Sequence, residues 1–163
     1  HIRRQRQMCI RDSSKVMVEQ AIEGRELECA LIGNEQLRCS RVGEIVSNHE
    51  FYSYEAKYID ENGADLKAPA DIDSKTEDAI QKIAVEAFHC LDCRDLARVD
   101  VFLTKEGEIF VNEINTLPGF TRISMYPKLW EVSGLSYTEL ITELIELAQS
   151  RNRAEIATDS TFY

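Results

Sequence analysis

The chain has 163 residues, of which 44% are hydrophobic, and this suits one compact unit or a piece of a larger protein rather than a mostly disordered chain. A formal net charge of −10 disfavours nucleic acid as a partner, because phosphate backbones are bound by clustered Lys and Arg, and it suits a divalent cation better. No apolar run approaches the roughly 20 residues needed to cross a bilayer and no export signal is present, so we expect a cytoplasmic protein without a membrane partner.

The first part of the chain changes character at residue 14. Residues 1–13 are rich in Arg and Gln without helix or strand periodicity, which indicates a non-native or disordered leader, with a basic arm as the alternative. The runs 15–22, 25–33 and 36–46 are rich in β-forming residues and predict three strands. Residues 48–70 are polar with scattered aromatic residues and predict a long loop.

The clearest helix is predicted over residues 73–91, where apolar residues recur at helical spacing. Ser74, with Glu77 three residues later, predicts the N-cap of this helix. After the two strands described next come an irregular loop, a short segment at 125–134 and a final amphipathic helix that starts near Ser136.

Two apolar runs, 98–104 and 108–115, predict an antiparallel hairpin with a symmetric turn centred on Glu106-Gly107. In that register four polar side chains project from one face of the sheet as two opposed pairs, Asp100 with Glu113 and Arg98 with Asn115. Opposed carboxylates destabilise a purely structural sheet, because cross-strand Cβ atoms lie only about 4.5–5.5 Å apart. We therefore expect a cation between them.

The chemistry of these side chains narrows the choice of cation. Carboxylate and amide oxygens are hard ligands, so Asp100, Glu113 and Asn115 favour Mg²⁺ or Mn²⁺ over zinc. Such an ion usually completes its coordination with water and substrate phosphates, which makes a nucleotide the natural companion. The alternative is a solvated sheet face with ordinary surface charge, which leaves Arg98 and the adjoining loop unexplained.

The loop at 116–122 begins where the second strand of the hairpin ends. Gly119 in this loop permits close approach of the backbone to a reacting group. Ser124 follows at the start of the next segment and is placed to donate to a carboxylate. A Pro-Gly loop alone is weak evidence for a functional site. The evidence is stronger here because the loop lies beside the four polar residues.

Four segments, "VEQAIEGRELECALIG", "FYSYEAKY", "LARVDVFLTKEGEIFVNEINTLPGFTRISMYP" and "GLSYTELITELIELA", resemble the C-terminal half of the D-alanine–D-alanine ligases. The resemblance runs from about Ser14 to Arg151. It implies an α+β fold of the ATP-grasp type, with a mostly antiparallel sheet flanked by helices. It also implies the remainder of a central ATP-binding subdomain at 14–52, a C-terminal catalytic subdomain at 53–151 and a tail at 152–163.

The resemblance implies a role for individual residues in binding nucleotide and metal. Asp100, Glu113 and Asn115 match the ligands of two Mg²⁺ ions, with Mn²⁺ as a substitute, that bridge the ATP phosphates. The implied contacts to the nucleotide are Glu19, Gln20 and Ile22 near the adenine, Glu26 at the ribose hydroxyls, Phe51, and Lys57 at the phosphates. Gln20 stands where the family often has Lys.

The resemblance also implies the catalytic and substrate-binding residues. Arg98 and the backbone N–H of Gly119 would stabilise the oxyanion, and Tyr58 would belong to a mobile loop that covers the site. Ser124 and the N–H of Met125 would bind the carboxylate of the second D-alanine. Replacing Arg98 by alanine is expected to reduce the rate by about 10²–10³ with the fold retained.

The implied activity is ATP-dependent joining of two D-alanines through an acylphosphate, for peptidoglycan precursor synthesis. The family's N-terminal substrate domain has no counterpart here, so we expect a fragment that does not ligate alone and a homodimer only in the full-length protein. The alternatives are a D-alanine–D-lactate or D-alanine–D-serine ligase of glycopeptide resistance, a non-catalytic Mg-nucleotide-binding module, and a metal-dependent nuclease. The "EAKY" pattern with Tyr58 favours the dipeptide product, and the acidic charge disfavours the nuclease.

Overall fold

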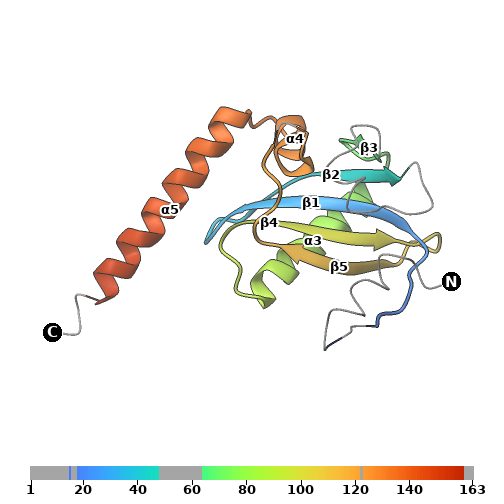
Figure 1. The fold of residues 1–163 in the computed structure, drawn as a ribbon, viewed down its shortest axis with the longest axis horizontal. Helices are drawn as coiled ribbons and strands as arrows, with labels where there is room; N and C mark the ends of the chain where they lie inside the picture. Colours follow the sequence, from blue (N-terminus) through green and yellow to red (C-terminus); the bar gives the residue numbers. More distant parts are fainter. Residues whose placement is uncertain (1–14, 16–17, 48–63, 122, 160–163) are drawn as a thin grey trace.

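A computed structural model describes residues 15, 18–47, 64–121 and 123–159. Its centre is a five-stranded antiparallel sheet in the order β3-β2-β1-β4-β5 (Figure 1). The strands are β1 (Arg25–Gly33), β2 (Arg38–Ser47), β3 (Ala64–Lys67), β4 (Asp95–Leu103) and β5 (Ile109–Asn115). The helices are α3 (Ser74–Cys90), α4 (Met125–Val132) and α5 (Tyr137–Asp159).

The two faces of the sheet are covered by different helices. On one face the odd-numbered residues of β1, such as Leu27 and Leu31, form a core with Ile80 and Phe88 of α3. On the other face the even-numbered Ala30 and Ile32 pack against α4 and the start of α5. Because both faces are covered, the second half of β1 reads as a continuous run of buried residues rather than an alternating one.

Helix α4 lies close to the sheet. The Tyr126 hydroxyl donates a hydrogen bond to the carbonyl of Leu31 at 2.9 Å, and the Tyr126 side chain is fully buried. Gly43 on β2 permits this approach, since a Cβ at that position would lie 2.7 Å from Leu129 Cδ2. The close approach fixes the position of α4 on the sheet.

Most of the predicted elements are confirmed. The strand predicted at 25–33 is β1, the strand predicted at 36–46 is β2, and both strands of the predicted hairpin are present. The fold class, an α+β arrangement with a mostly antiparallel sheet flanked by helices, is also confirmed. The predicted domain boundary at 52/53 stays a prediction, although one sheet contains strands from both sides of it.

Three local predictions are wrong. Residues 18–22 are not a strand, because β-propensity does not make a strand without a partner, and in the described part of the chain none pairs with them. The predicted loop at 48–70 contains β3, which pairs with β2 at the edge of the sheet. The N-cap of α3 is Asp73 rather than Ser74, since the Asp73 carboxylate accepts from the Thr76 N–H at 2.9 Å.

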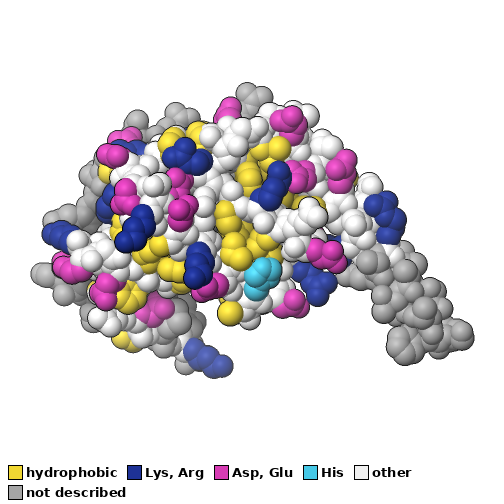
Figure 2. Space-filling view, turned by 180° about the vertical axis from the view of Figure 1, so that it is seen from behind, with side chains coloured by type: hydrophobic (Ala, Val, Ile, Leu, Met, Phe, Trp, Pro, Cys, Tyr) yellow, Lys and Arg dark blue, Asp and Glu magenta, His cyan; other side chains and the backbone are white. Residues whose placement is uncertain are grey.

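The surface behind the view of Figure 1 carries acidic and basic side chains close together (Figure 2). Among the described residues no helix is long and apolar enough to span a membrane.

Candidate active site on strands β4 and β5

The hairpin of β4 and β5 brings the four predicted polar residues together. Asp100 pairs with Glu113 and Arg98 pairs with Asn115, so all four side chains project from one face. This is the face that also carries α4, opposite α3. The predicted pairing is confirmed.

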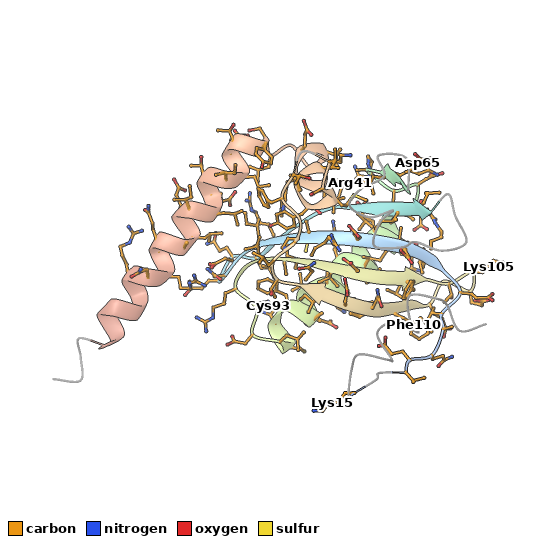
Figure 3. All side chains as sticks on the ribbon, viewed as in Figure 1. Lys15, Arg41, Asp65, Cys93, Lys105 and Phe110 are labelled. Atoms are coloured by element: carbon orange, nitrogen blue, oxygen red, sulfur yellow. The ribbon has the colours of Figure 1, made fainter. Side chains whose placement is uncertain are left out.

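The turn that produces this register differs from the predicted symmetric one. Near the turn Leu103 pairs with Ile109, and Gly107 adopts a positive φ of 85°, so the loop holds an odd number of residues. A β-bulge between Asp100 and Val101 then restores the predicted pairs further along the strands. Lys105 marks the turn in Figure 3.

Arg98 forms the centre of a buried charge cluster. Its Nε and Nη2 donate to the two carboxylate oxygens of Asp100, both at 2.7 Å. Its Nε also lies 3.2 Å from Oε2 of Glu28, which comes from the neighbouring strand β1. The side chains of Arg98 and Glu28 are only 13% and 3% exposed, and that of Asp100 is 12% exposed.

The carboxylates keep this guanidinium charged. Burial by itself lowers the pKa of Arg98, but the hydrogen bonds to Asp100 and the charges of Glu28, Asp100 and Glu113 raise it well above the ordinary value. Part of the positive charge that the opposed carboxylates require therefore comes from Arg98 itself. A divalent ion at this site would therefore add to the charge that Arg98 already supplies.

The donor set nevertheless suits a hard divalent cation. Asp100, Glu113 and Asn115 offer oxygens from one face of two paired strands, which is the ligand type that Mg²⁺ and Mn²⁺ prefer. Two of these residues already accept hydrogen bonds, Asp100 from Arg98 and the Asn115 amide oxygen from the Leu117 N–H at 3.0 Å. Among the described residues no three His, Cys, Asp or Glu side chains form a ready metal-binding group.

The loop after β5 has its own hydrogen bonds. The Ser124 hydroxyl accepts from the Thr121 N–H at 3.0 Å and shares a hydrogen bond with the Thr121 hydroxyl at 2.8 Å. A Cβ at position 119 would lie 3.0 Å from Ser124 Oγ, a tight contact that Gly119 avoids. Ser124 occupies the N-cap position of α4 without a side-chain capping bond, and Met125 begins that helix with its side chain buried.

The predicted nucleotide-binding residues are placed only in part. Glu19 and Gln20 are exposed and Ile22 is half-buried in the segment before β1. Glu26 pairs with Phe102 of β4, two residues before Glu28, so its exposed side chain lies on the face of the polar residues. Three further predicted positions lie outside the described residues: Phe51 at the nucleotide, Lys57 at the phosphates and Tyr58 of the loop predicted to cover the site.

Glu28 is the residue of this cluster that sequence reasoning missed. It is a carboxylate in the middle of an otherwise apolar run, "LECALI". That is the same signal that identified Asp100, and it would have identified Glu28 as well.

Comparisons with known proteins agree with this geometry. The family model described as "D-ala D-ala ligase C-terminus" matches residues 2–146, which includes most of the segment predicted to be a leader. The chain is 58% identical over 147 residues to D-alanine–D-alanine ligase A of Salmonella typhimurium and covers 40% of it, with 90% of this chain aligned. It is 62% identical over 141 residues to D-alanine–D-alanine ligase of Oceanobacillus iheyensis and covers 38% of it, with 86% of this chain aligned.

Solved structures give the same result. The D-alanine–D-alanine ligase of Coxiella burnetii superposes with a TM-score of 0.76 at 40% identity, over 88% of this chain and 37% of that one. The VanG D-Ala:D-Ser ligase of Enterococcus faecalis superposes with a TM-score of 0.69 at 40% identity, over 78% of this chain and 37% of that one. The D-alanine–D-alanine ligase of Bacillus anthracis complexed with ATP has a TM-score of 0.69 at 25% identity, over 84% of this chain and 42% of that one.

The sheet, with α3 on one face and α4 beside the polar residues on the other, superposes on ligases of known structure and has the ATP-grasp fold. The chain belongs to the D-alanine–D-alanine ligase family and corresponds to its C-terminal domain. It spans about 40% of the length of the curated relatives that it matches.

Proposed function

We propose that this chain supplies the ATP- and metal-binding part of an enzyme that joins two D-alanines for peptidoglycan precursor synthesis, in the cytoplasm. The observation that supports this most strongly is the opposition of Asp100 and Glu113 beside Arg98, on one face of a sheet in a chain of this family. A homodimer of the complete enzyme stays a prediction.

The proposed reaction has two steps. The γ-phosphoryl group of ATP passes to the carboxylate of one D-alanine, which gives an acylphosphate and ADP. The amine of a second D-alanine then attacks the acyl carbon, and phosphate leaves from the tetrahedral intermediate to give the dipeptide. Each step develops negative charge, and the protein's task is to position the reactants and stabilise that charge.

Different residues of the described part of the chain would bind the metal and stabilise the developing charge. Asp100, Glu113 and Asn115 would hold one or two Mg²⁺ ions, or Mn²⁺, and bound metal would neutralise charge on the ATP phosphates. Arg98 and the backbone N–H of Gly119 would donate to the carbonyl oxygen as it becomes anionic.

The remaining proposed contacts hold the substrates. Ser124 and the N–H of Met125 would bind the carboxylate of the second D-alanine. Glu26, on the same sheet face as the charge cluster, would accept from the ribose hydroxyls, and the adenine would lie near Ile22. Lys57 and Tyr58 would contact and cover the phosphates.

A chimera tests the proposal directly. This chain replaces the matching segment of the Salmonella typhimurium ligase A, and phosphate release from ATP is measured with and without D-alanine. The proposal predicts D-alanine-dependent release together with formation of the dipeptide. ATP binding without turnover would support the non-catalytic module instead.

The same assay separates the ligases of different product, and a DNA-binding measurement tests the nuclease. The VanG D-Ala:D-Ser ligase is as similar in sequence as the Coxiella burnetii D-alanine–D-alanine ligase, so D-serine and D-lactate are offered as the second substrate beside D-alanine. We expect D-alanine to be the preferred second substrate.

Duplex DNA binding that resists moderate salt would favour the nuclease instead.

A further inference from the structure

Glu28 is a carboxylate at the centre of the sheet. It is 2% exposed and pairs with Gly43 on one side and with Asp100 on the other. Burying a carboxylate is unfavourable unless it is paired with a cation, and here Arg98 is that cation. A buried ion pair is itself weak evidence for stability, since apolar residues of similar volume often do as well or better. The burial of Glu28 therefore requires another explanation.

Glu28 lies beside the guanidinium of Arg98. The guanidinium has carboxylates on two strands: Asp100 of its own strand accepts hydrogen bonds from Nε and Nη2, and Oε2 of Glu28 on β1 lies 3.2 Å from Nε as an ion pair rather than a hydrogen bond. The two-point hydrogen bond to Asp100 fixes the plane of the group, and the negative charge of Glu28 attracts it toward β1. If the bond to Asp100 weakens, the attraction to Glu28 still limits the rotamers of the long Arg side chain.

The two contacts are not equivalent. Asp100 is 12% exposed and is a proposed metal ligand, so its oxygens would be shared between Arg98 and the ion. The Glu28 side chain is 3% exposed and lies deeper in the sheet. Glu28 is thus the contact that remains available to Arg98 when Asp100 binds metal.

We propose that Glu28 is a positioning residue that holds Arg98 in place to meet the developing oxyanion. This rests on the proposed ligase function. An oriented donor contributes mainly in the transition state, so its loss lowers kcat and leaves the KM for ATP nearly unchanged. We expect Glu28→Gln, which keeps the size of the side chain and removes its charge, to lower kcat about 10- to 100-fold.

The test is a double-mutant cycle in the chimera. Glu28→Gln is made in the wild-type background and in the Arg98→Lys background, and Glu108→Gln, an exposed change in the same hairpin, serves as the control. If Glu28 acts through Arg98, the substitution changes kcat less than about twofold in the Arg98→Lys background. An equal loss in both backgrounds, or a kcat for Glu28→Gln equal to that of Glu108→Gln, overturns the proposal.

A second measurement does not depend on turnover. In the 163-residue chain, the ¹⁵N NMR signal of the Arg98 Nε–H group reports its environment directly. We expect Glu28→Gln to shift this signal and to accelerate its hydrogen exchange, while Glu108→Gln does neither. An unchanged signal overturns the positioning role. A chimera without D-alanine-dependent turnover overturns the proposed function instead, and the NMR result then decides the role of Glu28.

Discussion

Replacing Arg98 by alanine removes the positive centre of a buried cluster. Glu28 and Asp100 would then be left without the guanidinium, with side chains only 3% and 12% exposed. Breaking a buried ion pair by removing one partner typically destabilises a protein by about 3–5 kcal/mol. Exposure this low leaves little solvent screening to reduce that figure. A domain of this size is stable by about 5–15 kcal/mol, so we expect a large share of its stability to be lost.

This changes the interpretation of the variant. The sequence alone predicts that Arg98→Ala loses activity with its fold retained, whereas the burial of Glu28 predicts partial unfolding of this variant at physiological temperature. Urea unfolding of the 163-residue chain followed by far-UV circular dichroism measures the loss. Glu28→Gln should stabilise the Arg98→Ala chain although it weakens the wild type, because it removes a buried negative charge that no longer has the Arg98 guanidinium beside it.

A matched arginine provides the control. Arg94 forms an ion pair with Asp92 at 3.5 Å, with side chains 54% and 86% exposed, so Arg94→Ala should change the unfolding free energy by less than about 1 kcal/mol. A loss under about 1 kcal/mol for Arg98→Ala as well would refute the reasoning. So would a Glu28→Gln substitution that destabilises both backgrounds equally.

Three further predictions concern the scaffold. Tyr126→Phe removes a buried hydroxyl that donates to a β1 carbonyl at 2.9 Å, and should lower the urea-derived unfolding free energy by about 1–2 kcal/mol; no change would contradict the contact. Gly43→Ala places a methyl 2.7 Å from Leu129 Cδ2 and should cost about 1–3 kcal/mol by overpacking, whereas an unchanged melting temperature would show that α4 moves freely. Hydrogen bonds from Arg25 hold the pKa of Glu44 below its usual range. The pair therefore stabilises the folded protein fully above the unfolded pKa of about 4.3, and this stabilisation is lost as pH falls through the folded pKa. The unfolding free energy of Glu44→Gln should therefore fall less than that of the wild type on acidification. If the unfolding free energies of the two proteins fell equally with pH, the Arg25–Glu44 pair would not be the source of this pH dependence.

The register of the central hairpin followed from the sequence for a physical reason. Side chains alternate along strands, so a one-residue slip would have moved Asp100 and Glu113 to opposite faces, and the pattern of apolar residues forbids it. The turn was harder to predict. Gly107 favours a loop with an odd number of residues, which shifts the pairing by one residue near the turn. A bulge further along shifts it back, so Asp100 still pairs with Glu113.

The elements that sequence reasoning missed depend on partners distant in the chain. The strand β3 has only four residues, "ADLK", and exists because β2 offers it an edge to pair with. The opposite error occurred at residues 18–22, where β-forming residues have no strand beside them in the described part of the chain. Propensity alone decides neither case.

The charge cluster shows what sequence could and could not give for the site. Opposed acids on one sheet face predicted a cation, and part of that positive charge comes from Arg98, two residues from Asp100 on the same strand. The sequence marks Glu28 as a carboxylate in an apolar run, but its contact with Arg98 depends on β1 lying beside β4, a pairing that no local pattern specifies.

The central claim is that the oxygens opposed across β4 and β5 bind a divalent ion together with ATP. Electron paramagnetic resonance of Mn²⁺, measured in the chimera in the presence of ATP, tests it most directly. The account predicts that Glu113→Gln weakens Mn²⁺ binding at least about tenfold while Glu108→Gln in the same hairpin leaves it unchanged. Equal Mn²⁺ affinity in the two variants would contradict the claim.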